Sequence, residues 1–386
     1  MTTQQGPAQR TTESMLAEIA CGTAAEVVMA ARYANHPPGP TYVPTLDDAI
    51  RPARGDEPST LRRGDMVEII GPSGSGKTTL ALFLVLTRIL PASITVDLPG
   101  PTTQPMTIPL GGRADHVTFL HPSSHRSPVL SLSRHLHQHI SGHALDALSA
   151  QLKPRHLTPY LASQIKLAVR DSLRRLTVIR TKPRWKSMYL ALLALQHPPA
   201  HERAENEPRR LDMVVVDGFA DGFWPERWVT EDRQQEKKAE GRIRRPEDVG
   251  LRDVMAALEA LRKEMGAVVV LTLQGLWPQN GVYTPHLPAP YPAPFARDRE
   301  DAPSRAWPLN IQITLTGRVA SHQLPADSTL IDALRTNGSL QTRGGEAQSQ
   351  LFEGVVRVPG ADGVVGTATG VKFEMHMGDA GVEVWT

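Results

Sequence analysis

A short stretch rich in glycine constrains the fold of this chain more than any other feature of its sequence. The stretch reads Gly71-Pro72-Ser73-Gly74-Ser75-Gly76-Lys77-Thr78-Thr79, and it lies between the strand-like residues 66–70 and the helix-like residues 80–89. This pattern between a strand and a helix is typical of a phosphate-binding loop. Its glycines allow the backbone N–H groups to point at a phosphate, and the helix N-terminus adds its positive end. We therefore predict that residues 71–79 bind a nucleotide within an α/β fold.

The two side chains after the last glycine supply the specific chemistry of this predicted site. The Lys77 ammonium is expected to reach the β- and γ-phosphates, and the Thr78 hydroxyl is expected to coordinate Mg²⁺. A glycine-serine turn that only joins a strand to a helix has no need of a lysine and a hydroxyl at these positions. The expected cofactors are therefore ATP and Mg²⁺.

The second landmark is a run of apolar residues that ends in an aspartate. Residues 211–216 read Leu-Asp-Met-Val-Val-Val, and Asp217 follows them. Such a run is typical of a central parallel strand that is buried on both faces. Ligands of open α/β sheets lie at the carboxyl ends of these strands. We therefore predict that Asp217 supports the Mg²⁺ ion together with Thr78.

The remaining patterns predict a mostly parallel central sheet that is flanked by helices. Further strands are expected at residues 116–120, 176–179 and 267–273, with helical segments at residues 127–173, 185–195 and 253–264. From residue 310 onward, apolar residues alternate in places, which predicts antiparallel strands that close one edge of the sheet. Residues 1–60 are predicted to form a helical preface followed by a proline-rich linker or edge-hugging segment. Residues 61–386 are predicted to form the core. Its long loops are expected at residues 98–113, 221–250 and 275–308.

Charge and cysteine content limit the classes of function that the chain fits. The formal net charge is only +2, so contact with nucleic acid must come from local clusters. The single cysteine, Cys21, excludes an internal disulfide framework and is typical of a reducing compartment. Residues 1–10 lack a secretory signal, and no apolar run reaches the length of a membrane span. We expect a cytosolic or nuclear protein without a membrane partner.

The order of these landmarks resembles the RecA-like recombinases. The shared order is a strand with a phosphate loop, a strand with Asp217, and a strand that ends in Thr272-Leu273-Gln274. Within that group, the chain is more similar to the eukaryotic recombinase paralogues of the X-ray-repair cross-complementing group. The segments that carry this similarity are Arg63-Gly64-Asp65-Met66-Val67-Glu68, Ile89-Leu90-Pro91, Val216-Asp217-Gly218-Phe219-Ala220-Asp221-Gly222-Phe223-Trp224 and Gly378-Asp379-Ala380-Gly381-Val382-Glu383.

The resemblance implies a RecA-like P-loop ATPase core and a nuclear role in homologous-recombination repair of double-strand breaks. It implies a hetero-oligomer with other recombinase paralogues, which assembles or stabilises the main recombinase on single-stranded or branched DNA. It also implies that Gln274 senses the γ-phosphate and connects it to a DNA-binding loop.

RecA-like cores bind single strands through the loops after the aspartate strand and after the glutamine strand. Here these loops are residues 221–250 and 275–308. Their candidate DNA-binding residues are Arg233, Lys237, Lys238, Arg242, Arg244, Arg245, Trp277, Arg297 and Arg299. Cations that follow a phosphate backbone and aromatic faces that stack on bases suit single-stranded nucleic acid. Both loops also carry acids, and mixed charge is typical of solvated loops. We expect DNA contact to be shared with partner subunits.

The chain departs from the RecA-like pattern after its second core strand. RecA-like enzymes have a carboxylate there as general base, whereas residues 120–125 read Leu-His-Pro-Ser-Ser-His and contain no acid. We therefore expect a weak or absent ATPase. Two alternatives remain open. One is a DNA-stimulated ATPase with its carboxylate elsewhere, with Asp97 as candidate if residues 93–97 form the second strand. The other is an unrelated P-loop small-molecule kinase.

Histidines and basic residues form two further groups between residues 116 and 190. The histidines are His121, His125, His135, His139 and His143. Zinc sites usually add a cysteine or carboxylate at fixed spacing, so we favour a solvent-facing helix over a metal site. The basic residues are Arg174, Arg175, Arg180, Lys182, Arg184 and Lys186. They are typical of a nuclear address, a DNA-facing edge or a plain basic surface.

Overall fold

The computed structural model describes most of the chain after residue 38. The described residues are 39–54, 59–96, 105–151, 159–196, 211–223, 226, 228, 249–279, 282–285, 309–318, 350–358, 370–378 and 381–383. The chain divides into two compact units, Met1–Pro37 and Pro38–Thr386. All described residues belong to the second unit, and everything below concerns that unit.

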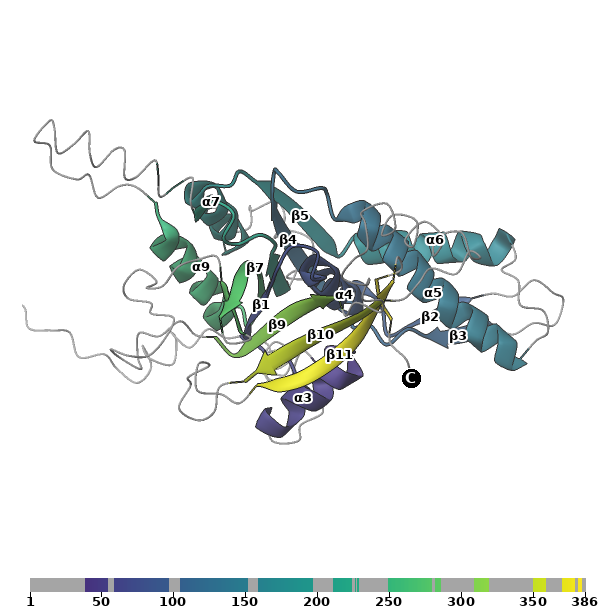
Figure 1. The fold of residues 1–386 in the computed structure, drawn as a ribbon. Coiled ribbons are helices and arrows are strands. Elements are labelled where there is room, and N and C mark those ends of the chain that lie inside the picture. The colour runs from purple at the N-terminus through teal and green to yellow at the C-terminus, as the bar shows by residue number, and fades with distance from the viewer. Residues whose placement is uncertain are drawn as a thin grey trace, which may run out of the picture. The chain divides into compact units, whose positions relative to one another are not determined.

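A mostly parallel sheet forms the centre of the described fold (Figure 1). Its parallel strands are β1 (Met66–Gly71), β4 (His116–Pro122), β5 (Leu176–Thr181), β6 (Leu211–Val216), β7 (Val268–Gln279) and β9 (Ile311–Arg318). Antiparallel strands β10 (Gln350–Arg357), β11 (Val371–Gly378) and β12 (Gly381–Glu383) extend one edge, and β8 (Val282–Pro285) pairs with β7. The strand order is β12-β11-β10-β9-β1-β7-β6-β4-β5.

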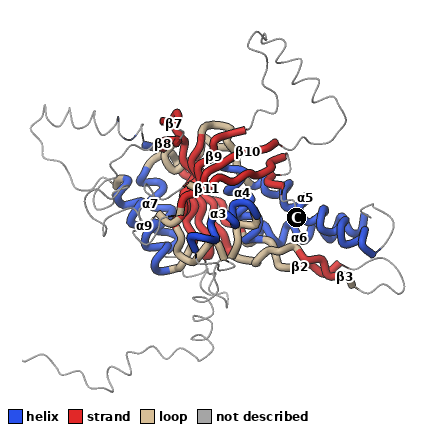
Figure 2. The backbone as a smooth tube through the Cα atoms, turned by 60° about the horizontal axis from the view of Figure 1, so that its bottom comes forward, coloured by secondary structure: helices blue, strands red, loops and turns tan. Residues whose placement is uncertain are grey.

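Helices cover both faces of the sheet (Figure 2). One face packs against α3 (Pro44–Arg54), α4 (Lys77–Ile89), α5 (Val129–Gln151) and α6 (Pro159–Leu173), and the other packs against α7 (Trp185–Gln196) and α9 (Leu251–Glu264). Side chains of β6 alternate between the two cores: Met213 and Val215 face α4, whereas Val214 and Val216 face α7 and α9. Burial on both faces explains why the central strands are continuously apolar.

The structure confirms the predicted central strands and their parallel arrangement. The second core strand is β4, which pairs with β5 and β6 in the central sheet. Residues 93–96 instead form β2 (Ser93–Val96), which pairs with β3 (Met106–Pro109) in a separate two-stranded sheet among the described residues. β3 also lies inside the predicted loop 98–113. Asp97 lies outside the described residues.

Two further segments differ from their predicted form. β9 pairs parallel with β1, so the antiparallel edge begins at β10 and not at residue 311. Alternation in sequence does not encode strand direction, which depends on how the preceding connection returns the chain. The predicted loop 275–308 begins with an antiparallel pairing of β7 and β8, because backbone hydrogen bonds extend β7 to Gln279.

The proline-rich part of residues 1–60, which was predicted as a linker or edge-hugging segment, contains helix α3. Pro44 occupies the first helical position, where its missing N–H costs no hydrogen bond. The Asp47 carboxylate accepts hydrogen bonds from the backbone N–H groups of Thr41 and Tyr42 at 2.8 and 3.0 Å, which fixes the entry to the helix. Leu46 and Ile50 are fully buried against the sheet, and α3 lies along β11 at the edge (Figure 1).

Arg88, in the last turn of α4, places a charged group inside the larger core. Its side chain is 1% exposed, and its guanidinium nitrogens make no hydrogen bond within the described residues. The nearest carboxylate oxygen, Oδ2 of Asp115, lies 4.0 Å away. Burial lowers the pKa of Arg88 to about 10, with the Arg113 charge as a second cause. The charged form is therefore disfavoured at this position.

We predict that Arg88→Met leaves the free energy of unfolding unchanged or raises it by about 1 kcal/mol, because an apolar side chain of similar length avoids the cost of burying the charge. Arg88→Ala is the matched control, and it should lower the free energy of unfolding by about 2–3 kcal/mol because it leaves a cavity. Urea denaturation measures both. A loss for Arg88→Met as large as that for Arg88→Ala would contradict the prediction.

Candidate nucleotide-binding site

The glycine-rich loop lies between a strand and a helix, as predicted, but α4 begins at Lys77, three residues before the predicted start at residue 80. Two of its glycines are required by close contacts. A methyl group at Gly71 would lie 2.5 Å from the Ser75 hydroxyl oxygen and 2.6 Å from the Leu315 carbonyl oxygen. Gly76 has a φ of 84°, and a methyl group there would lie 2.5 Å from the Met377 sulfur. The loop is therefore shaped by β9 and β11 as well as by its own sequence.

The Lys77 ammonium lies within this loop. Its Nζ donates hydrogen bonds to the carbonyl oxygens of Gly71 at 2.9 Å and Pro72 at 2.7 Å. Burial lowers the pKa of Lys77, while the Asp217 and Asp221 charges oppose that shift. The side chain therefore lies along the loop where the predicted phosphate would lie, and its hydrogen-bond acceptors there are two neutral carbonyl groups.

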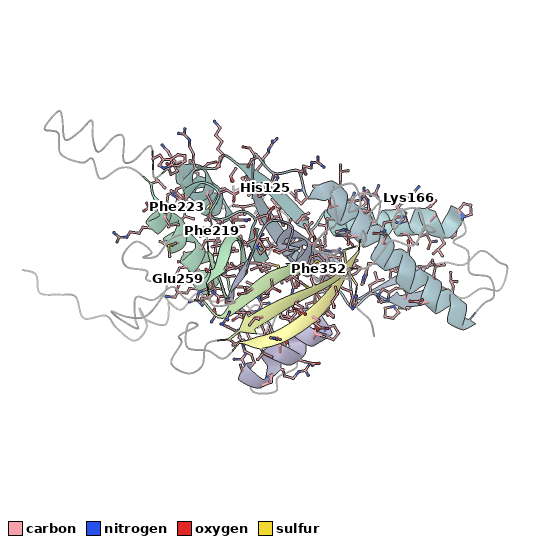
Figure 3. The ribbon with its side chains drawn as sticks, viewed as in Figure 1. His125, Lys166, Phe219, Phe223, Glu259 and Phe352 are labelled. Atoms are coloured by element: carbon pink, nitrogen blue, oxygen red, sulfur yellow. The ribbon has the colours of Figure 1, made fainter. Side chains whose placement is uncertain are left out.

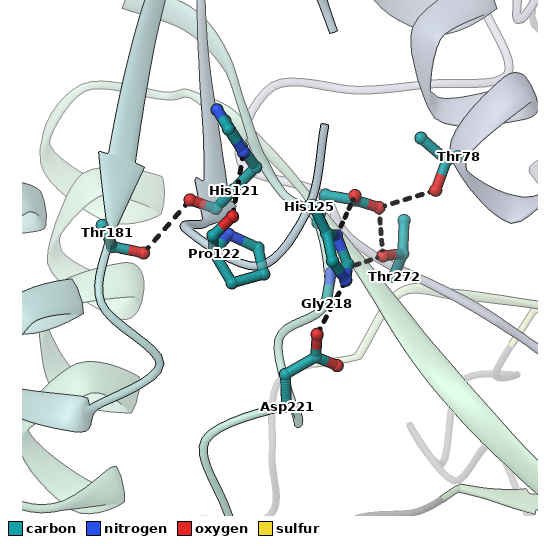
Figure 4. Close-up of polar contacts among 9 residues, drawn as sticks. Thr78, His121, Pro122, His125, Thr181, Gly218, Asp221 and Thr272 are labelled. Atoms are coloured by element: carbon teal, nitrogen blue, oxygen red, sulfur yellow. Dashed lines mark hydrogen bonds and ion pairs between the residues drawn. The ribbon is translucent and has the colours of Figure 1, made fainter. Parts of the chain in front are cut away.

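Asp217 joins the loop to the carboxyl ends of two other strands (Figure 4). Its Oδ1 accepts hydrogen bonds from the Thr78 hydroxyl at 2.9 Å and from the Thr272 hydroxyl, on β7, at 2.7 Å. The Gly218 N–H in turn donates to the Thr272 hydroxyl at 2.8 Å. Burial acts to raise the pKa of Asp217, but the bonds from His125, Thr272 and Thr78 outweigh it and hold the pKa below its usual value.

His125 is a site residue that the sequence analysis missed. Its Nδ1 lies 3.0 Å from Oδ2 of Asp217, and its Nε2 lies 2.9 Å from Oδ2 of Asp221 (Figure 4). The hydrogen bond with Asp217 is the main cause that raises the pKa of His125 above its usual value, against the opposing effect of burial. The ring therefore bridges two carboxylates at the edge of the site.

The prediction of a solvent-facing helix was wrong for two histidines. His121 is a buried residue of β4, and His125 lies in the loop after that strand. Their position after a predicted core strand was the feature of the sequence that could have indicated a place near Asp217. Parallel strands place their carboxyl ends at one edge of the sheet, so a residue after β4 comes close to Asp217 once β4 and β6 are neighbours.

These residues line a cavity of about 470 Å³, which is within the usual range for small-molecule sites. Loop residues 73–79 form one wall, and His125, Asp217 and Asp221 form another. Gln274 also lines the cavity, because it is paired in register with Gly71. Phe352 and Met377, from the antiparallel strands, form an apolar wall of the cavity. The sequence analysis also missed these two residues. Figure 3 labels Phe352 together with His125.

The donor set at Thr78 and Asp217 fits a magnesium ion. A hydroxyl oxygen and a carboxylate oxygen meet at the cavity wall, and Mg²⁺ prefers hard oxygen ligands together with phosphate oxygens and water. Within the described part of the chain, no group of three histidine, cysteine, aspartate or glutamate side chains is placed to hold a metal ion. The His139 ring contacts the Leu110 carbonyl oxygen at 3.2 Å.

The side chains predicted to bind DNA all lie outside the described residues. Trp277 is part of β7, but its side chain is not among those described. The same holds for Arg233, Lys237, Lys238, Arg242, Arg244, Arg245, Arg297 and Arg299. In the described ranges, none of the helices has the length and apolar character needed to cross a membrane.

Comparison with known proteins adds no family assignment. No protein-family model matches this chain, and no curated protein matches it at a significant level.

The His125–Asp217 ion pair predicts a pH-dependent contribution to stability. The raised pKa of His125 gives a stabilising effect that is fully present below the usual histidine value of 6.5 and is lost as pH rises through the folded pKa. The lowered pKa of Asp217 gives an effect that is present above 3.8 and is lost as pH falls through its folded pKa. The pair therefore stabilises most between these two limits.

We predict that His125→Gln lowers the free energy of unfolding by about 1 kcal/mol near pH 5.5, a value kept small because the imidazole is partly exposed. The difference from wild type should be smaller in a second measurement at about pH 9, because the stabilising effect is lost as pH rises through the folded pKa of His125. His143→Gln, on the exposed side of α5, is the control. Denaturation at both pH values measures the effect, and an equal loss at both would show that the ion pair does not contribute.

Proposed function

We propose that this chain binds ATP together with Mg²⁺ in the cavity between the glycine-rich loop and Asp217. The observation that carries the proposal is the contact at 2.9 Å between Thr78 and Asp217, residues that are 139 positions apart in the sequence. A hydroxyl from a glycine-rich loop and a carboxylate from a neighbouring strand, beside a lysine, form the combination that phosphate-loop NTPases use for nucleotide and metal.

Each part of the cavity has a role in this proposal. The backbone N–H groups of the loop and the start of α4 hold phosphate oxygens, and Lys77 exchanges its carbonyl acceptors for the β- and γ-phosphates. Thr78 and Asp217 hold Mg²⁺, which when bound neutralises part of the phosphate charge. Gln274 also lines the cavity and is the candidate γ-phosphate sensor.

We further propose that the chain is a RecA-like recombinase paralogue in homologous-recombination repair. The proposed setting is a nuclear hetero-oligomer with other paralogues, which assembles or stabilises the main recombinase on single-stranded or branched DNA. Two observations support it: the sequence motifs around residues 63–68 and 216–224, and the adjacency of the three landmark strands, with β7 between β1 and β6. ATP then acts by favouring one conformation of the assembly, to the extent that it binds that conformation more tightly.

ATP hydrolysis by this chain is the second candidate function. The absence of an acid at residues 120–125 argues against it, but His125 faces the cavity from that same segment. Imidazole is a common general base, but both ring nitrogens of His125 contact carboxylates, so one of these contacts must be released before the ring can accept a proton. Single-turnover hydrolysis with single-stranded DNA present distinguishes the two functions. Tight binding without turnover supports an ATP-dependent switch, and turnover that requires Lys77 supports an enzyme.

We predict that Lys77→Ala weakens ATP binding by roughly 100-fold, because it removes charge-assisted hydrogen bonds to phosphate. Lys166→Ala is the control, since Lys166 is an exposed lysine of α6 and does not line the cavity (Figure 3). Equilibrium titration with ATP and Mg²⁺ measures both affinities. An unchanged affinity for Lys77→Ala would refute the assignment of the loop.

A further inference from the structure

An exposed basic surface lies at the carboxyl ends of β4 and β5, beside the nucleotide cavity. We define the β5 basic surface by five exposed cationic residues: Arg126, Arg180, Lys182, Arg184 and Lys186. Arg126 comes from the loop after β4, and the others run from the end of β5 into the first turn of α7. The nitrogen-tipped side chains around β5 and α7 are visible in Figure 3.

The charge of this region stands out against the balance of the whole chain. The chain has 42 Lys and Arg residues against 40 Asp and Glu residues, whereas residues 172–196 contain six cationic residues and no acid. Like charges that gather on one surface repel one another and attract anions. Such a concentration in a nearly neutral chain therefore indicates an anionic partner.

The four cations from the end of β5 onward alternate with less exposed neighbours. Arg180, Lys182, Arg184 and Lys186 are exposed, whereas Thr181 and Trp185 between them are buried and Pro183 is half-buried. Each of the four cations therefore reaches solvent, although only Arg180 lies in the strand. Several exposed cations within a short stretch suit a polymer with repeated phosphates better than a single anionic group.

The surface is held by regular structure, not by a free loop. The Ser123 N–H donates to the Thr181 carbonyl oxygen at 2.7 Å, and Arg180 Nη2 donates to the Ser123 carbonyl oxygen at 2.5 Å. These bonds join the loop after β4 to the end of β5. The start of α7 at Trp185 adds the positive end of a helix dipole to the same region.

This surface also adjoins the nucleotide site. A methyl group at Gly222 would lie 2.8 Å from the Pro183 carbonyl oxygen, so the loop after β6 packs directly on the basic turn. Asp221 in that loop contacts His125, which in turn contacts Asp217 and precedes Arg126. A structural change at the nucleotide site would therefore reach residues that contact the basic surface.

We propose that the β5 basic surface binds the phosphate backbone of single-stranded nucleic acid. The inference rests on the proposed function in recombination, which supplies the partner, while the surface itself is separate from residues 221–250 and 275–308. Binding to phosphates gives affinity that does not depend on base sequence and that falls as salt rises. The nearby packing of Gly222 on Pro183 makes this binding sensitive to the state of the nucleotide site.

The test measures binding of a fluorescently labelled single-stranded oligothymidylate by anisotropy over a series of salt concentrations. The surface variant replaces Arg180, Lys182, Arg184 and Lys186 with alanine. The control variant replaces Arg134, Lys166, Arg252 and Lys372 with alanine, which removes the same number of arginines and lysines from exposed positions on α5, α6, α9 and β11. ATP affinity is measured on each preparation.

We expect the surface variant to bind the oligonucleotide at least about 10-fold more weakly, with a salt slope that is smaller by roughly 0.7 for each phosphate that the variant no longer neutralises. The control variant should keep most of the affinity and slope, and all three proteins should bind ATP. Equal decreases in the two variants would overturn the inference, since net charge alone would then explain binding. The inference would also be overturned if wild-type protein bound ATP but did not bind the oligonucleotide. The same holds if wild-type protein bound only anionic phospholipid vesicles or an acidic peptide.

Failure of the proposed function has a different signature. If wild-type protein binds the oligonucleotide through this surface but does not bind ATP, the nucleic-acid-binding role of the surface is supported and the proposed nucleotide site is refuted. Because Arg180 also contacts Ser123, a second variant keeps it and replaces only Lys182, Arg184 and Lys186 with alanine. Loss of oligonucleotide binding in this variant, with unchanged circular dichroism, supports the inference independently of any folding defect in the first variant.

Discussion

The candidate site depends on the hydrogen bonds that the carboxylate of Asp217 accepts. It is buried, and it accepts hydrogen bonds from side chains of three separate segments: Thr78 from α4, Thr272 from β7 and His125 from the loop after β4. A buried carboxylate is costly unless such donors surround it. These donors stabilise the charged form and fix the distance between the glycine-rich loop and the neighbouring strands. The same carboxylate is the proposed ligand of Mg²⁺.

The parallel sheet makes this convergence possible. Strands β1, β7, β6 and β4 are neighbours and run in the same direction, so their carboxyl ends lie at one edge. Apolar side chains on both faces hold the strands in register between two layers of helices. The antiparallel strands then bring Phe352 and Met377 over the loop, and Met377 leaves room only for glycine at position 76. Fold and site are therefore determined by the same packing.

Sequence reasoning located the parts of the site that short motifs encode. The loop 71–79 and Asp217 were predicted because each follows a recognisable strand and carries its chemistry within a few residues, whereas Gln274 was predicted from the resemblance to RecA-like recombinases. His125 was missed because its partner Asp217 is 92 positions away, and only the order of β4 beside β6 brings them together. Phe352 and Met377 were missed for the same reason. The parallel direction of β9 depends on its connection and not on its own alternation. The residues proposed for the two DNA loops stay predictions, since their side chains are outside the described residues.

The most direct test of the central claim is a double-mutant cycle on the gain in ATP affinity that Mg²⁺ provides. The proteins compared are wild type, Thr78→Val, Asp217→Asn and the double variant. If Thr78 and Asp217 hold one ion, each single variant should lose most of that gain, and the double variant should lose little more than either one. Losses that simply add, or a gain from Mg²⁺ that survives in the double variant, would contradict a shared magnesium site.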